Sequence, residues 1–175
     1  MSRWIYTLCL VISVVFSASA ASTPELQTVH HLHLYHTHTQ ERLDIIYREG
    51  DAYIPGALDK LEHFLRDHRT GTVHHFDPRL FDLLDDLTRS LGKPATEIDV
   101  VCGYRTPWSN NYLRSRSSAV AQHSLHMKAM AIDIRIPGVT TRQLRNTALS
   151  LHRGGVGFYP REDFVHVDVG RIRQW

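Results

Sequence analysis

Alternating or short apolar runs predict strands along much of the chain. Residues 30–39 alternate leucine with polar side chains, as a half-buried strand does, and residues 41–49 read as its hairpin partner. The other predicted strands are short and more apolar: residues 97–105, which run into a glycine turn, 128–138, which end at Pro137-Gly138, 154–160 and 163–170. We expect the closing segments to lie in one antiparallel sheet.

Three further segments place apolar residues at helical spacing. Residues 55–69 open with a proline, and residues 140–152 begin with a threonine cap. Residues 77–92 have Asp77 as the expected N-cap, Pro78 at the first helical position and Gly92 as the stop. Residues 110–122 read as a poorly amphipathic helix or a loop. Because helices and strands are mixed without regular βαβ alternation, we predict an α+β fold, a small antiparallel sheet with flanking helices.

The first twenty residues differ from the rest of the chain. Arg3 precedes an apolar run from Trp4 to Phe16, and the small residues Ala18-Ser19-Ala20 follow. This order is typical of a secretory signal peptide. The apolar run is shorter than the ~20 residues that a membrane-spanning helix needs. We predict a signal peptide over residues 1–20 and one exported domain over residues 21–175, with no stable membrane insertion.

Composition narrows the class of protein. Cys9 leaves with the signal peptide, so Cys102 is the only remaining thiol and no internal disulfide can form. The remaining ~155 residues suit one domain with its own core. Loss of Arg3 lowers the formal net charge from +2 to +1. So small a charge gives no support to a nucleic-acid partner.

The candidate chemistry lies near the end of the chain. On a strand, His166 and Asp168 point to one face and the flanking valines to the other. Such a polar pair needs partners if it is buried. His126, expected in the loop before a strand, and Asp133, within that strand, can supply them.

Two imidazoles and one carboxylate, with a position left for water, match the ligands of a catalytic zinc ion. A structural zinc site usually has four protein ligands with several thiolates, and manganese or iron accept the same ligand types. The alternative is that Asp133 pairs with Arg135 or Arg105 while His166 is a core histidine. The spacing of the residues leaves both interpretations open.

The surrounding motifs resemble a known group. Residues 124–133, "SLHMKAMAID", are similar to the S-x-H-x-x-G-x-A-x-D signature of the zinc D,D-peptidases and hedgehog-type metallopeptidases, and "CGYRT" resembles their S-G-Y-R turn. The exported bacterial branch typified by murein endopeptidase K also resembles this chain in "LYHTHTQERL", "LRDHRTG", "DPRLFDLL", "GVGFYPREDFVHVDVG" and the terminal Trp175. The resemblance covers nearly the whole mature chain.

The resemblance implies roles for individual residues. His126, Asp133 and His166 would bind one zinc ion together with water, and Arg105 would face the substrate and the developing oxyanion. Related zinc peptidases carry an acid three residues before the last histidine, which makes Asp163 the expected general base here. Asp168 competes for that role or else orients His166.

Two residues depart from the pattern. Ala129 stands where the signature has glycine, and Cys102 stands where serine precedes Gly-Tyr-Arg. Alanine costs little at negative φ but is strained at positive φ. Cysteine can bind a metal or be oxidised. Neither change removes a predicted ligand.

A second group of histidines lies near the start of the mature chain. On a strand, His31 and His33 share one face with Tyr35, and His30, His36 and His38 lie on the other. Such an arrangement can chelate a metal, although a tract of this kind is more often a polar edge.

The resemblance implies a periplasmic zinc metallopeptidase that hydrolyses meso-diaminopimelate-containing cross-links, 3-3 or 4-3, in peptidoglycan during wall growth. One alternative is a D,D-carboxypeptidase that acts on stem peptides. The other is a non-catalytic peptidoglycan-binding module that retains the pocket. The sequence indicates no oligomeric state.

Overall fold

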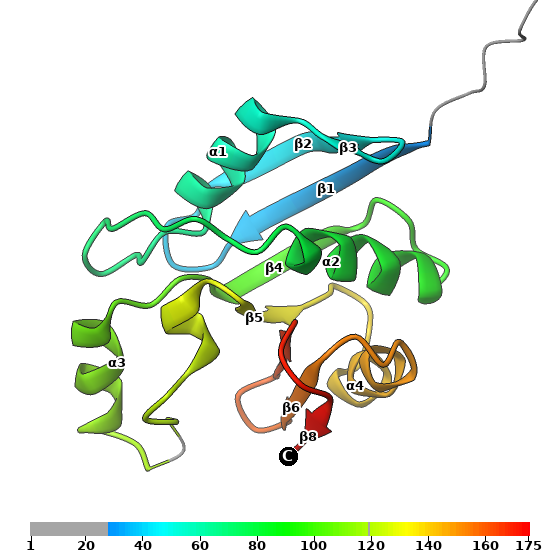
Figure 1. Cartoon of the computed structure of the whole chain (residues 1–175). Helices are drawn as coiled ribbons and strands as arrows, with labels where there is room; N and C mark the ends of the chain where they lie inside the picture. The colour runs from blue at the N-terminus through cyan, green and yellow to red at the C-terminus, as the bar shows by residue number, and fades with distance from the viewer. Residues whose placement is uncertain (1–27, 119) are drawn as a thin grey trace, which may run out of the picture.

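A computed structural model describes residues 28–118 and 120–175 (Figure 1). The predicted signal peptide lies outside these residues. The strands are β1 (Val29–His36), β2 (Arg42–Glu49), β3 (Ala52–Tyr53), β4 (Glu97–Cys102), β5 (Ala131–Arg135), β6 (Gly155–Tyr159), β7 (Phe164–Asp168) and β8 (Arg173–Gln174). The helices are α1 (Pro55–Phe64), α2 (Arg79–Ser90), α3 (Pro107–Arg114), α4 (Thr141–Ser150) and the 3₁₀ turn η1 (Leu125–Lys128).

The described strands form one sheet in the order β3-β2-β1-β4-β5-β7-β6-β8. The predicted α+β class is confirmed, and β5, β7 and β6 pair antiparallel as expected. The sheet is larger than the predicted small antiparallel one, and it is mixed. Parallel pairing of β1 with β4 joins the first hairpin to the closing strands, and β8 pairs parallel with β6. Sequence pattern alone does not specify such long-range pairings.

One face of the sheet is covered by helices. Helix α1 packs against β2, α2 against β1, and α4 against β6 and β7. The strand residues on this face form the core, and pairing aligns them across the sheet: Leu34 with Ile98, Val100 with Ile134, and Ile132 with Val167 and Val156. The core therefore lies between the sheet and these three helices.

The opposite face carries the polar residues, and we call it the site face. The pairing places these residues on it: Asp44, His33, Glu97, Asp99, Arg135, Cys102, Asp133, His166 and Gly157. Alternation along each strand separates them from the core residues. The sequence pattern of His166 and its flanking valines predicted this separation for β7.

The helix ends follow local sequence signals. Thr140 caps α4, with its Oγ1 accepting a hydrogen bond from the Gln143 backbone N–H at 3.2 Å. Helix α2 begins at Arg79, one residue later than predicted, and the Asp77 carboxylate accepts from the Arg79 N–H at 3.1 Å. Gly92 ends that helix region at φ +68°. Within the described residues, no helix has the length and apolar character to cross a bilayer.

Candidate metal centre

His126, Asp133 and His166 meet on the site face. Asp133 of β5 and His166 of β7 are direct cross-strand partners. His126 approaches from η1, whose Ser124 cap accepts a hydrogen bond from the His126 backbone N–H at 3.3 Å. All three side chains are buried. The convergence that the sequence could not establish is therefore present.

Three ligand-type atoms form a close triangle. His126 Nε2 lies 3.1 Å from Asp133 Oδ1 and 3.1 Å from His166 Nδ1, and His166 Nδ1 lies 2.9 Å from Asp133 Oδ1. Two atoms bound to zinc at ~2.0–2.1 Å with a tetrahedral angle lie ~3.3 Å apart. The triangle is thus of the right size for one small cation.

Hydrogen bonds on the far side of each imidazole fix its tautomer. His126 Nδ1 lies 2.8 Å from the Gly103 carbonyl, and because a carbonyl only accepts, Nδ1 must donate. His166 Nε2 likewise donates to Asp168 Oδ2 at 3.1 Å. In both neutral rings, the nitrogen that faces the triangle then carries a lone pair. Two lone pairs and a carboxylate face one another, so these residues fit a divalent cation.

Asp168 is a fully buried carboxylate with fixed partners. Besides His166, it accepts from the backbone N–H groups of Gly155 and Gly170 at 3.0 and 2.9 Å and from Arg173 at 2.7 and 3.1 Å. Burial by itself raises the pKa of Asp168, but these hydrogen bonds hold the pKa well below its usual range. Asp168 is therefore ionised and placed to orient His166, the alternative role that the sequence left open.

Two glycines make room for Asp168. A Cβ on Gly154 would lie 1.7 Å from the Asp168 carbonyl oxygen, and a Cβ on Gly155 would lie 2.4 Å from Asp168 Oδ2. Both distances are shorter than non-bonded contacts allow. The pair "GG" before β6 therefore has a specific role in holding β7 close.

The charges of His126 and Asp133 in the triangle depend strongly on each other. Burial lowers the pKa of His126, but the Asp133 carboxylate and Cys102 raise it to about 10. Burial raises the pKa of Asp133, whereas the two histidines hold it below its usual range. The buried Asp133 charge therefore requires positive charge beside it, either from a proton on His126 or from a cation.

Arg105 and Cys102 lie next to the triangle. The Arg105 guanidinium lies 3.8 Å from Asp133 Oδ2, 3.3 Å from Asn110 Oδ1 and 3.3 Å from Cys102 Sγ. Its buried Nε has no hydrogen-bond partner among the described residues. Cys102, His126 and Asp133 present ligand atoms within 4.8 Å of one another. Cys102 is thus close enough to affect the pKa of His126.

Ala129, which stands where the signature has glycine, adopts a strained backbone conformation with positive φ. It ends η1 at φ 49° and ψ 41°, in the left-handed region, and it is fully buried. An L-residue costs about 1–2 kcal/mol in this conformation, which explains why the signature has glycine there. The strain lies three residues after His126.

Asp163 is not brought to the triangle. Its side chain is 65% exposed, accepts from Thr141 Oγ1 at 2.5 Å and lies 3.9 Å from Arg135. It lines a separate cavity with these residues. The expectation of a general base at Asp163 therefore finds no geometric support. Residue spacing could not reveal this, because Asp163 has φ +54° in the turn before β7.

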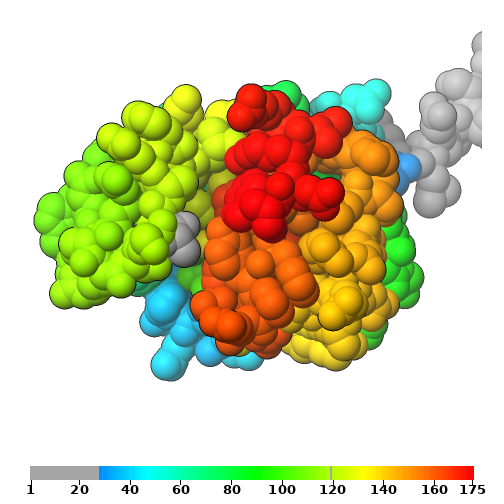
Figure 2. All heavy atoms as spheres, turned by 90° about the horizontal axis from the view of Figure 1, so that it is seen from below, coloured from blue at the N-terminus to red at the C-terminus, as the bar shows by residue number. Residues whose placement is uncertain are grey.

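A cavity of about 240 Å³ opens at the triangle. Figure 2 shows the two sides that flank it: the yellow-green segment after α3, and the orange and red closing strands. Its lining includes Arg105 and the three triangle residues. It also includes four residues that the sequence-based reasoning did not assign to the site: Tyr159, Glu162, Phe164 and Trp175. Alternation along β6 and β7 was the available signal for the two strand residues, Tyr159 and Phe164.

The α+β fold and a buried triangle of two imidazoles and a carboxylate beside a cavity are the features expected of a metal-dependent hydrolase. The family described as "Peptidoglycan L,D-endopeptidase MepK" matches residues 24–175. The chain belongs to this family of peptidases, as the sequence motifs predicted.

Two relatives show how far the likeness extends. The chain is 42% identical over 137 residues to the probable peptidoglycan L,D-endopeptidase MepK of Haemophilus influenzae, which covers 78% of this chain and 74% of the relative. It is 40% identical over 162 residues to the peptidoglycan L,D-endopeptidase MepK of Escherichia coli K12, and the match covers 91% of this chain and 85% of the relative. Among solved structures, none gives a significant match.

Proposed function

We propose that this protein is a periplasmic, zinc-dependent endopeptidase that hydrolyses peptide cross-links in peptidoglycan. His126, Asp133 and His166 are the proposed zinc ligands. The observation that carries the proposal is the triangle of two imidazole nitrogens and a carboxylate oxygen at the cavity. Export follows from the predicted signal peptide over residues 1–20.

The zinc ion, when bound, supplies a Lewis acid and lowers the pKa of a bound water to about 7. The chain supplies the positioning. Asp168 and the Gly103 carbonyl hold the two imidazoles so that their lone pairs face the cavity. The Arg105 guanidinium lines the cavity with its Nη2 3.8 Å from Asp133 Oδ2, and we assign it to the substrate carbonyl or a nearby carboxylate.

Hydrolysis needs a carboxylate in the cavity that takes a proton from the attacking water and passes it to the leaving amine. Asp168 is fully engaged, and Asp163 lines a different cavity. Glu162 lines the main cavity together with His166, and it is not used as a ligand. We therefore assign the role of proton acceptor to Glu162 in preference to Asp163.

The names of the relatives suggest which peptide cross-link is cleaved. Both are described as L,D-endopeptidases. In a 3-3 cross-link, the carboxyl group at the L-centre of one diaminopimelate is joined to the amine at the D-centre of the next, whereas a 4-3 cross-link begins at a D-alanine carboxyl group. We therefore propose the 3-3 cross-link as the substrate.

Digestion of purified sacculi tests this proposal. The protein with zinc should convert cross-linked dimers into monomeric muropeptides, a chelator should stop the reaction, and His166→Ala should be inactive. His123→Ala, a change of an exposed histidine outside the triangle, is the matched control and should remain active. Loss of 3-3 dimers with 4-3 dimers intact supports the L,D assignment.

Two results would contradict the proposal. Release of D-alanine from stem peptides without loss of dimers would indicate a D,D-carboxypeptidase. Binding to sacculi with an unchanged muropeptide profile would indicate a non-catalytic wall-binding module, and the strain at Ala129 would then be one candidate cause.

A further inference from the structure

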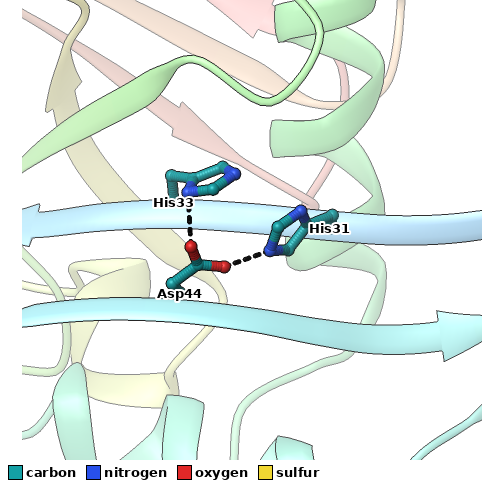
Figure 3. Close-up of side chains that lie close together, drawn as sticks. All are labelled: His31, His33 and Asp44. Carbon is teal, nitrogen blue, oxygen red and sulfur yellow. Dashed lines mark hydrogen bonds and ion pairs between the residues drawn. The ribbon is translucent and has the colours of Figure 1, made fainter.

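A second group of metal-ligand side chains lies on the β1–β2 hairpin. His31 and His33 are two residues apart on β1, so both project from the site face, and Asp44 lies opposite His33 on β2. Figure 3 shows the two rings turned toward the one carboxylate. With neighbouring strands ~4.8 Å apart and a rise of ~3.3 Å per residue, this group lies on the order of 20 Å from the metal centre.

The three side chains converge closely. His33 Nδ1 lies 3.1 Å from Asp44 Oδ2, and His31 Nε2 contacts Asp44 Oδ1. The two imidazole centroids are 4.1 Å apart with an angle of 55° between the ring planes. One ligand atom from each residue falls within 4.8 Å of the others. This is the same ligand set, two imidazoles and one carboxylate, as in the metal centre.

Solvent reaches the group from one side. The side chains of His31 and His33 are 33% and 30% exposed, and that of Asp44 is 65% exposed. A cation bound there can keep water in its remaining positions. The nearby positive charge is already compensated, because Arg42 pairs with Glu97 at 3.0 Å and stacks on Tyr35. The surroundings therefore do not repel a cation strongly.

We propose that His31, His33 and Asp44 form a second binding site for a divalent transition-metal cation of the zinc type. Imidazole nitrogens favour such ions over calcium or magnesium, which prefer oxygen ligands. Because the ligands come from two strands, the bound ion links β1 to β2 next to the register shift between His30 and His31. The inference stands on these three residues and does not depend on the proposed enzymatic function.

Metal stoichiometry tests the site. The protein, purified without a polyhistidine tag, is dialysed against zinc buffered at micromolar free concentration, and bound zinc is measured by atomic emission. Wild type should retain two equivalents, His31→Gln/His33→Gln one, His166→Ala one, and the combined variant none. His63→Gln, which changes an exposed histidine of α1, should retain two.

Thermal unfolding provides a second measurement. In the His166→Ala background, zinc should raise Tm, and the further change Asp44→Asn should abolish most of that increase. Equal zinc content in wild type and His31→Gln/His33→Gln would overturn the inference. Muropeptide release should be unaffected by the His31 and His33 changes, so failure of this site is distinguishable from failure of the metal centre.

Discussion

His166 donates its Nε2 proton to the carboxylate of Asp168, two residues further along the same strand, at 3.1 Å. This bond sets which nitrogen of His166 faces Asp133. Since Asp168 is itself held by Arg173 and two backbone N–H groups, its orientation is fixed by the fold. The geometry of the centre thus depends on a residue that is not one of the proposed ligands.

The Asp168→Asn variant should bind zinc 10–100-fold more weakly. An asparagine keeps the shape, but its NH2 group donates toward His166 Nε2, which favours the tautomer with the proton on Nδ1, facing the triangle. Competition with a chromophoric chelator at neutral pH measures the affinity, and circular dichroism checks the fold. Asp99→Asn, on the same sheet face outside the main cavity, is the control and should bind normally. Equal affinities for both variants would refute the orienting role.

Asp163→Asn should reduce muropeptide release by less than about threefold. A true general base contributes roughly 10²–10⁴-fold, but the Asp163 carboxylate lies against Thr141 and Arg135 rather than in the main cavity. Glu162→Gln should lower kcat at least tenfold with zinc binding unchanged. The two variants are assayed side by side on the same sacculi. A large loss in Asp163→Asn alone would restore the assignment made from the sequence.

Gly157→Ala should raise KM more than it lowers kcat. A Cβ on Gly157 would lie 2.7 Å from the Trp175 indole, which lines the cavity 5.2 Å from the His166 ring and donates to the Tyr159 hydroxyl at 2.8 Å. The indole must therefore shift out of its place at the cavity wall. Steady-state kinetics on a soluble cross-linked dimer separates the two constants. Gly56→Ala, where a Cβ meets nothing within 4 Å, is the control.

The sequence predicted more of the centre than of its surroundings. His166 and Asp168 share a face because alternation along a strand is a local property, and the structure agrees. The position of Asp133 within a strand and of His126 in the turn before it was also local. The approach of these two residues to His166 depends on the pairing of β5 with β7, for which the family motifs were the available guide.

Asp163 shows where this reasoning stops. Its separation of three residues from His166 predicted a general base, and that role stays a prediction. Asp163 has a positive φ in the turn before β7, and its carboxylate contacts Thr141 and Arg135. Backbone conformation at a single turn residue is not encoded by spacing. For Ala129, the sequence showed that the cost of alanine depends on the sign of φ. The structure was needed to show that φ is positive. Parallel pairing of β1 with β4 was missed for a different reason, since partners distant in sequence leave no local pattern.

We expect His36 to make the free energy of unfolding depend on pH. The ring is fully buried, and its Nδ1 accepts hydrogen bonds from the backbone N–H groups of His38 and Thr39 at 3.2 and 3.4 Å. Burial, together with the nearby His38, lowers the pKa of His36 from 6.5 to about 4. Burial likewise lowers the pKa of His68 to about 4. Both rings are therefore neutral in the folded protein at mildly acidic pH.

Acid should destabilise the protein as pH falls from about 6.5 to about 4, because the unfolded chain takes up protons there that folded His36 does not. The loss from His36 is at most about 3 kcal/mol. Urea unfolding at about pH 7.5 and about pH 4.5 measures it. His36→Asn keeps an acceptor for the His38 N–H but cannot titrate, so the difference in free energy of unfolding between the two pH values should shrink. His63→Asn, at an exposed position on α1, should leave that difference unchanged, and an equal difference in all three proteins would contradict the role of His36.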